Sequence, residues 1–354
     1  MKTNINDLNQ KSVAVDEFFN NALFDKKKGY YSTKNPFGKK GDFVTAPNIS
    51  DIFSEIIGIW IISTWEKLGK PRRVNLIELG PGDGSLAKIL IRTFKRFPEF
   101  NSSVNFFLYE KSDFLIKIQK KKMKDKSGKV FWIKDFKKIN SGPVIFFGNE
   151  FFDAIPIKQF LIHRNHYFEK YYNTSKNGVK EFYKKAKNSD KKKLKSFKSL
   201  KGLNFVEYPK LGFQELDKII KKILFLSGGI LLIDYGYLQS QNLNTLQSIK
   251  RHKKTNIFKN PYEADITYLV NFNLLSEYFL KKHLKVKKIV TQKFFLEKMG
   301  IVERANILKK SMNKLQVNNL EKRLHRLLDR EMMGDLFKVI FAFKSINDDI
   351  LGFN

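Results

Sequence analysis

The chain has 354 residues, and its 67 Lys and Arg against 35 Asp and Glu give a formal net charge of +32. A hydrophobic content of 42%, with 34 Phe and 13 Tyr, excludes a chain that is disordered throughout, because a solvated coil carries less apolar surface. The complete absence of Cys excludes disulfides, thiolate zinc sites, iron–sulfur clusters and cysteine nucleophiles. We expect one large domain or two moderate ones.

Most of the basic residues are lysines. Only 10 of the 67 basic residues are Arg, the residue that proteins favour for bidentate contacts with phosphates and base edges. The excess of Lys over Arg is typical of an AT-rich genome, whereas the excess of Lys over acidic residues is not explained by codon use. The sequence therefore predicts a basic surface field, and we do not expect nucleic acid to be its main partner.

The N-terminal region, residues 1–73, is predicted to form a leader with one apolar helix at 51–69. Its first residues lack the apolar core of a secretory signal and the Arg-rich pattern of an organellar presequence. Within the segment GDFVTAP, Asp42 and Thr45 offer polar groups that would reach a ligand if the segment closes over it as a lid. The alternative is a segment that simply packs on the edge of a sheet.

From residue 74 onward, strand-like and helix-like segments alternate. The predicted helices have apolar residues at helical spacing with Lys on the outer face, and they lie at 85–97 and 112–124. The predicted strands are near-continuous apolar runs at 74–80, 104–110, 130–136, 143–151 and 229–236. Such runs are typical of strands buried on both faces of a parallel sheet, so the fold class is a doubly wound α/β sheet. Late strands at 284–292 and 337–344 would complete its edge.

Residues 156–210 separate the fourth and fifth predicted strands and form an insertion in the domain 74–354. A hairpin is predicted around 163–173. The following segment, 184–201, has nine Lys against one Asp, which predicts a solvated, mobile loop. The alternative for this segment is a docking surface for an acidic partner. No apolar run reaches the ~20 residues of a membrane span.

The glycine-rich run IELGPGDGSLA leaves a predicted strand and enters a predicted helix. Gly80, Gly82 and Gly84 allow a tight turn and close approach of a ligand. A dinucleotide-binding loop needs a glycine where this chain has Ser85. Glu78, two positions before the first glycine, suits a cationic ligand better than a pyrophosphate. The pattern is typical of proteins that bind S-adenosylmethionine (SAM), with a dinucleotide site and a purely structural turn as alternatives.

Two further carboxylates follow predicted strands. Glu110 ends the second strand and could accept hydrogen bonds from both ribose hydroxyls, as acidic residues do at the equivalent place in Rossmann folds. Asp135 ends the third strand and could accept from the adenine amino group. For Glu110 the alternative is a favourable charge at a helix N-terminus, and for Asp135 an exposed acid without a ligand.

The fourth predicted strand ends in GNEFFDAIP, which places Asn149, Glu150 and Asp153 at the ligand crevice of such a sheet. Two carboxylates and an amide fit a nitrogen acceptor, and Glu150 with Asp153 could hold a guanidinium through charge-assisted hydrogen bonds. Asp234 and Tyr235, after the fifth strand, join the same rim. The five His residues lack the spacing of metal ligands, so we expect no metal.

Seven blocks then occur in order: the leader block 29–60, ELGPGDGSLA, NEFFDAIPIKQF, IDYGY, TLQSIKRH, ADIT and TQKFFLEKMGI. With them the chain resembles the MidA-type SAM-dependent methyltransferase family from about residue 16 to 344. This family includes the mitochondrial arginine methyltransferase that serves as an assembly factor of respiratory complex I, where the acceptor is an arginine of the 49-kDa subunit. The resemblance implies a class I methyltransferase fold, SAM as methyl donor and a protein arginine as acceptor.

Without a presequence, the chain is interpreted as a bacterial, cytoplasmic member whose partner is a protein substrate. Two departures from the family weaken the transfer of substrate identity: Asp83 stands where members commonly carry Arg, and the Lys-rich segment 184–201 is an elaboration. The alternatives to arginine methylation are an RNA or DNA methyltransferase and a non-catalytic assembly chaperone. The sequence predicts neither the target nor the oligomeric state.

Overall fold

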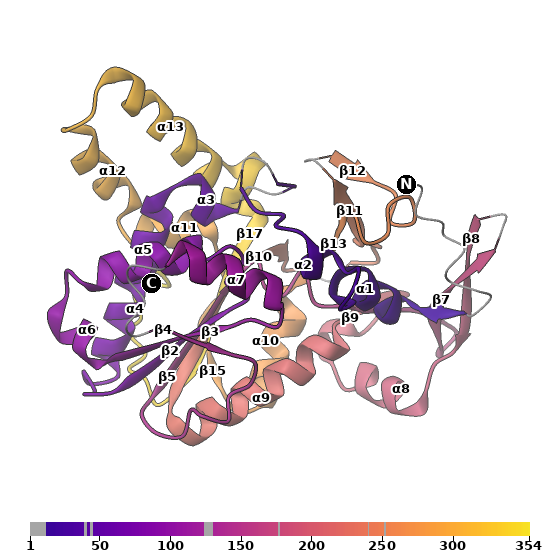
Figure 1. Ribbon diagram of the computed structural model, residues 1–354. Helices are drawn as coiled ribbons and strands as arrows, with labels where there is room; N and C mark the ends of the chain where they lie inside the picture. The colour runs from indigo at the N-terminus through magenta and orange to yellow at the C-terminus, as the bar shows by residue number, and fades with distance from the viewer. Residues whose placement is uncertain are drawn as a thin grey trace.

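The computed structural model describes residues 12–38, 41–42, 45–123, 130–175, 178–239, 241–250 and 253–354. Its central sheet has the strand order β15-β17-β10-β5-β2-β3-β4, with β14 beside β10 and β16 beside β17 (Figure 1). The bounds are β2 Val74–Leu79, β3 Val104–Tyr109, β4 Val130–Ile133, β5 Val144–Asn149, β10 Gly228–Tyr237, β14 Val270–Asn271, β15 Lys285–Val286, β16 Val290–Thr291 and β17 Phe337–Lys344. The predicted doubly wound sheet is confirmed.

The five strands from β4 to β10 are parallel, and β17 runs antiparallel to β10. The chain enters the sheet at β2 and continues outward through β3 and β4, then returns to the other side of β2 with β5 and β10. The carboxyl ends of β2 and β5 therefore flank the point where strand order reverses, which is where open α/β sheets bind ligands. The predicted strand 284–292 is instead two short strands, each paired with β17.

Helices cover both faces of this sheet (Figure 1). α4 (Asp51–Lys67) and α5 (Ser85–Phe94) pack into one apolar core, whereas α9 (Lys210–Leu226) and α10 (Phe272–Lys281) pack into the other. The remaining helices are α1 Val15–Phe24, α2 Tyr30–Thr33, α3 Ala46–Ile49, α6 Pro98–Ser103, α7 Asp113–Lys122, α8 Asn188–Lys195, α11 Gln292–Lys298, α12 Ile301–Lys309 and α13 Lys314–Leu328. The helices predicted at 51–69, 85–97 and 112–124 are thus present as α4, α5 and α7.

A second, antiparallel sheet joins the leader to the insertion. Its order is β1-β7-β6-β9, with β8 beside β7. The bounds are β1 Val13–Ala14, β6 Lys158–His163, β7 His166–Ser175, β8 Gly178–Lys185 and β9 Phe205–Tyr208. The predicted hairpin is β6–β7, and Val13 of the leader pairs with Tyr172 of the insertion. The strand β1 of the leader therefore extends the sheet of the insertion. The division of the chain into a leader and a catalytic domain stays a prediction.

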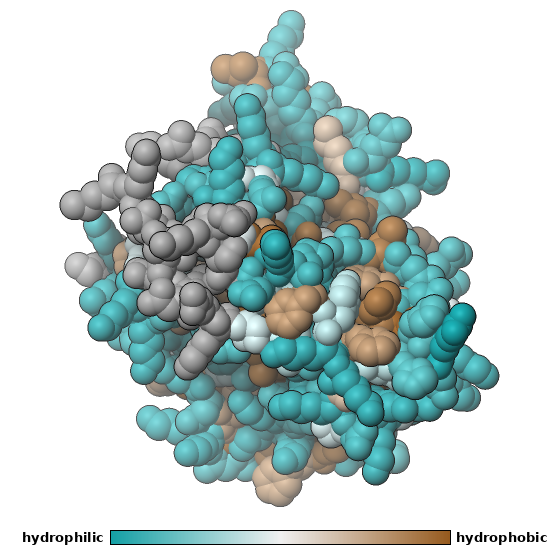
Figure 2. Space-filling view, turned by 90° about the vertical axis from the view of Figure 1, so that its right-hand side faces the viewer, coloured by the Kyte–Doolittle hydropathy of each residue, from teal (hydrophilic) through white to brown (hydrophobic). Residues whose placement is uncertain are grey.

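The Lys-rich segment 184–201 is not the mobile loop that its charge predicts. It contains the end of β8, the helix α8 and a 3-10 turn at Lys198–Leu200. Leu194, Phe197 and Leu200 are buried, and Phe197 packs against aromatic rings of the larger core. The lysines lie on the outside of this structure, and the face of the molecule that Figure 2 shows is largely hydrophilic.

A third, small sheet is formed by β11 (Gln247–Lys250), β12 (Lys253–Thr255) and β13 (Asp265–Thr267). Its strand β13 packs near α1 of the leader. Within the described ranges, every helix is too short or too polar to cross a lipid bilayer.

Candidate active site

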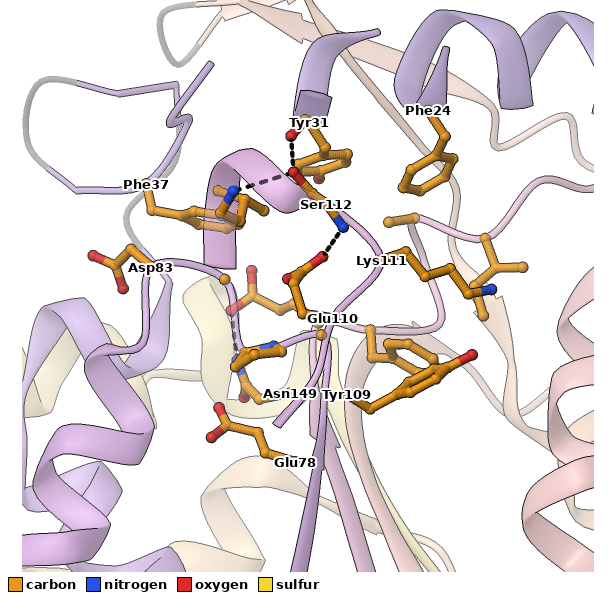
Figure 3. Close-up of a pocket in the computed structure, with 18 of the residues that line it drawn as sticks. Phe24, Tyr31, Phe37, Glu78, Asp83, Tyr109, Glu110, Lys111, Ser112 and Asn149 are labelled. Atoms are coloured by element: carbon orange, nitrogen blue, oxygen red, sulfur yellow. Dashed lines mark hydrogen bonds between the residues drawn. The ribbon is translucent and has the colours of Figure 1, made fainter. Parts of the chain in front are cut away.

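A cavity of about 990 Å³ opens at the carboxyl ends of β2, β3 and β5. Its size is at the upper end of the range of small-molecule sites. Seven of the residues predicted to form the site line it: Thr45, Glu78, Gly80, Gly82, Glu110, Asn149 and Glu150. The leader, the glycine loop and three strand ends therefore meet at one cavity (Figure 3).

The glycine loop adopts backbone conformations that side chains disfavour. Gly80, Gly82 and Gly84 have φ of 60°, 55° and 78°. A Cβ on Gly80 would lie 3.0 Å from the ring of Phe151, and one on Gly82 would lie 3.2 Å from the ring of Phe37. The first two glycines line the cavity, whereas Gly84 precedes α5 and faces α7. The loop thus forms a cradle that other residues would fill.

Glu78 supplies a buried negative charge beneath this loop. Its side chain is 3% exposed, and its Oε2 is buried without a hydrogen-bond partner among the described residues. Burial, with smaller contributions from Asp83 and Glu110, raises the pKa of Glu78 to about 8. A cationic ligand beside it would reverse this effect, because an opposite charge favours the ionised carboxylate. This environment fits the cationic groups of SAM.

Glu110 follows β3 and is held in place by its neighbours. Its Oε1 accepts from the backbone N–H of Ser112 at 2.8 Å (Figure 3). Its Oε2 accepts from Nε2 of Gln119 at 3.2 Å. Gln119 also donates to the carbonyl of Gly82, so one side chain links the two halves of the ligand cradle. Burial raises the pKa of Glu110 to about 7, against these hydrogen bonds. Each carboxylate oxygen keeps a second lone pair for a hydroxyl donor.

Glu150 lies directly after β5 in a strained backbone conformation. Its φ is 52°, which is uncommon for a residue with a side chain and is a kind of backbone strain that recurs at functional sites. Its Oε1 accepts from Nδ2 of Asn149 at 3.0 Å and from the backbone N–H of Ala46 at 3.4 Å. Asn149 Oδ1 is buried without a described partner. Burial, followed by Asp153, raises the pKa of Glu150 to about 7.

Asp153 and Asp234 lie behind Glu150 rather than on the cavity wall. Asp234 Oδ2 accepts from the backbone N–H groups of Phe152 and Asp153, at 2.8 and 3.2 Å, and so fixes the turn after β5. Burial raises the pKa of Asp153 to about 6 and that of Asp234 well above its usual range. Asp153 Oδ1 is buried and unpartnered among the described residues.

The leader forms one wall of the cavity. Thr45, Pro47 and Asn48 line it, and Asn48 Nδ2 donates to Thr45 Oγ1 at 3.0 Å. Three aromatic rings continue this wall and are visible in Figure 3: Phe24, Tyr31 and Phe37. The ring centroids of Phe24 and Tyr31 are 5.7 Å apart and stacked. Movement of this wall as a lid stays a prediction, and residues 43–44 of the predicted lid lie outside the described residues.

Two residues of this site are not among the predicted site residues, although Asp83 stands out in the sequence as a departure from the family in the glycine loop. Asp265, in the block ADIT, lines the cavity and is 3% exposed, and its Oδ2 accepts from the Tyr31 hydroxyl at 3.1 Å. Asp83 lines the cavity and forms a 2.6 Å ion pair with Lys122 of α7. The order of the blocks was the only sequence signal for Asp265.

Asp135 is a predicted site residue that does not line the cavity. It is exposed, and its Oδ1 accepts from the backbone N–H of Lys137 at 2.9 Å. Its predicted contact with adenine stays a prediction, and the neighbouring Lys134 lines the cavity instead.

Comparisons with known proteins agree with this geometry. Residues 56–290 match the model of a family described as S-adenosyl-L-methionine-dependent methyltransferases. The chain is 29% identical to the mitochondrial protein arginine methyltransferase NDUFAF7 of Xenopus laevis, over 92% of this chain and 80% of that protein. It is 30% identical to the Caenorhabditis elegans homolog, over 92% and 80%. It is 28% identical to the human protein, over 92% and 78%.

Among solved structures, a Burkholderia thailandensis protein crystallised with S-adenosyl-homocysteine is similar in fold. The TM-score is 0.81 at 19% identity, over 96% of this chain and 89% of that chain. At this identity the likeness concerns the fold. The family match spans the glycine loop and the ends of β3, β5 and β10.

Proposed function

This chain belongs to the family of SAM-dependent methyltransferases, and from that premise we propose that it methylates an arginine side chain of a protein. The observation that carries the proposal is Glu150, a partly buried carboxylate in a strained conformation on the cavity wall beside the cofactor cradle. The names of the related proteins, which are arginine methyltransferases, support the same acceptor.

The cofactor-binding residues are those that fit a cation and a nucleoside. Glu78 would bind the cationic end, Gly80 and Gly82 would allow close approach of the ligand, and Glu110 would accept from the ribose hydroxyls. When bound, SAM supplies a methyl group already activated by a positively charged sulfur. The protein therefore needs chiefly to position the acceptor and exclude water.

The acceptor is a cation that must lose a proton as it is methylated. Arginine is protonated at neutral pH, and its nitrogen gains a carbon while one N–H proton departs. Glu150 would accept hydrogen bonds from the guanidinium and then take up this proton, since burial in the ligand-free protein raises its pKa to about 7 and makes it a better base than an ordinary carboxylate. Asn149 orients Glu150, and Asp153 contributes negative charge from behind.

The target is proposed from the relatives alone. A respiratory complex I subunit of the 49-kDa type, methylated during assembly, would be the substrate in a bacterial cytoplasm. The relatives named above are mitochondrial proteins, so the compartment and the subunit both stay predictions.

Labelled SAM tests the proposal. The chain is incubated with methyl-labelled SAM and a lysate that lacks its own copy, and the labelled fraction is hydrolysed and analysed. We expect methylarginine in protein. Label that nuclease treatment removes would support a nucleic-acid methyltransferase instead. Failure to bind SAM and to transfer label would support the assembly-chaperone alternative.

A further inference from the structure

We propose that Asp265 is a specificity-determining residue that binds the acceptor guanidinium together with Glu150. The inference rests on the proposed function, because it requires a cationic acceptor. It deepens that function, since it explains how the cavity would select arginine over other side chains.

Asp265 reaches the cavity from a strand of the small sheet, whereas the other carboxylates of the site lie in or after strands of the main sheet. It begins β13, where its backbone pairs with Ile249 of β11. Its side chain is almost fully buried yet lines the same cavity as Glu150. The small sheet β11–β13 therefore places a carboxylate beside the ligand crevice of the main sheet.

Hydrogen bonds fix the orientation of this carboxylate but do not use all of its lone pairs. Oδ2 accepts from the Tyr31 hydroxyl at 3.1 Å, and Oδ1 accepts from the backbone N–H of Ile266 at 3.0 Å. Each oxygen retains a lone pair that can accept from a ligand. Phe24, Tyr31 and Phe37 line the same cavity and supply aromatic surface, on which guanidinium groups pack well.

Asp265 lies in an environment that disfavours its ionised form. Burial, followed by the charges of Asp153 and Asp42, raises its pKa well above the usual range. Among the described residues, none of the ion pairs involves Asp265, Glu150 or Asp153. Among the described residues, Asp153 Oδ1 is buried without a partner, although the Asp153 carboxylate accepts a hydrogen bond from Tyr235. A cation in the cavity would add the opposite charge that favours the ionised form of Asp265 and Glu150.

Two carboxylates from separate elements suit arginine in particular. The guanidinium is a planar fork with five N–H donors, whereas a lysine ammonium is a compact point charge and citrulline is neutral. Glu150 and Asp265 could each accept from a different edge of that fork. Loss of Asp265 should therefore weaken the preference for arginine more than it changes the chemical step.

The test uses a peptide that spans the arginine methylated in the labelling experiment, made also with citrulline at that position. Wild type, Asp265→Asn, Asp265→Glu and the surface control Asp348→Asn are compared. Loss of a hydrogen bond to a charged group is expected to weaken peptide binding by about tenfold or more. We expect Asp265→Asn to raise the KM of the arginine peptide and reduce the binding preference over citrulline by that factor. Asp265→Glu should recover part of both, and Kd for SAM should stay within about twofold.

An unchanged KM and preference in folded Asp265→Asn would overturn this inference and leave the proposed function intact. An equal rise in Kd for SAM and in KM would also overturn it, because it would indicate a general structural role. Absence of methylarginine with the wild-type protein would overturn the proposed function, and this inference with it, before any variant is compared.

Discussion

The backbone N–H of Ala46 donates a hydrogen bond to Oε1 of Glu150, 104 positions later, at 3.4 Å. This contact joins the leader to the carboxylate that ends β5. The Tyr31 hydroxyl makes a second connection, to Asp265. The leader is thus part of the site, since it contributes a wall of the cavity and orients two of its carboxylates.

Replacement of Glu78 should weaken SAM binding and change its pH dependence. A pKa of about 8 in the ligand-free protein means that SAM binding must ionise Glu78 below that pH, so protons are released and affinity rises with pH. For this one group, affinity should rise about fivefold from pH 7 to pH 8. Calorimetry with Glu78→Gln should show an affinity lower by about tenfold and a flatter profile.

The same calorimetry contains its control. The variant profile reports the titration of SAM itself and of the other residues, so the difference between the two profiles belongs to Glu78. Identical profiles and equal affinities would show that Glu78 does not face the cation.

Replacement of Gly80 by alanine should disrupt the ligand cradle, although it adds only a methyl group. A Cβ at this position meets the ring of Phe151 at 3.0 Å, and the residue has φ of 60°. Gly202 provides a matched control, since it has φ of 82° with nothing within 4 Å of an added Cβ. Both alanine variants should lose about 1–2 kcal/mol of stability from the left-handed backbone. Only Gly80→Ala should also lose SAM binding by calorimetry, and equal SAM affinity in the two variants would contradict the cradle.

Stability of the ligand-free protein should fall as pH rises from about 5 to 8. Folding raises the pKa values of Asp153, Glu150, Glu110 and Glu78 to about 6, 7, 7 and 8, so the folded state binds more protons than the unfolded state in this window. The stabilisation is complete below the unfolded pKa values near 4 and is lost as pH rises through the folded ones. Urea unfolding should show a decrease of at least about 2 kcal/mol.

Saturating SAM should reduce this decrease, because the bound cation favours the ionised carboxylates. A stability that rises steadily between pH 5 and 8 would show that these acids are not held in the environments described above.

The sequence predicted the part of the site that follows directly from buried strands. The strands β2, β3 and β5 are apolar runs with acidic residues at or just after their carboxyl ends. Glu78, Glu110 and Glu150 could therefore be found without tertiary information. The resemblance to the MidA-type family is confirmed by the family match. Asp265 could not be assigned a role, because only tertiary packing brings it to Tyr31, 234 positions away.

The Lys-rich segment 184–201 shows where composition misleads. Its nine lysines mask three apolar residues whose spacing allows burial on one side of a short helix and turn. Within 184–201 the sequence contains a single aromatic residue, Phe197. In the fold, Lys184 lies over the ring of Tyr171 at 4.6 Å, and Lys191 lies over that of Tyr167 at 5.8 Å.

Truncation of Phe197 tests whether this segment is folded. Its ring packs against Tyr208, Phe213 and Tyr278. Phe197→Ala should lower the free energy of unfolding by about 3–5 kcal/mol, as for other buried aromatic residues. The exposed Lys193→Ala should change it by less than about 0.5 kcal/mol. Urea unfolding and limited proteolysis distinguish the two, and equal stability of both variants would restore the mobile-loop interpretation.

The most direct test of the central claim is methyl transfer by Glu150→Gln, with methylarginine in protein measured by mass spectrometry and SAM binding measured by calorimetry. The amide keeps an oxygen that can accept from Ala46 but cannot take up the acceptor's proton. We expect methylarginine formation to fall by at least about 100-fold, with Kd for SAM within about twofold of wild type. Wild-type turnover in this variant would contradict the assignment of Glu150 as the carboxylate that holds and deprotonates the acceptor.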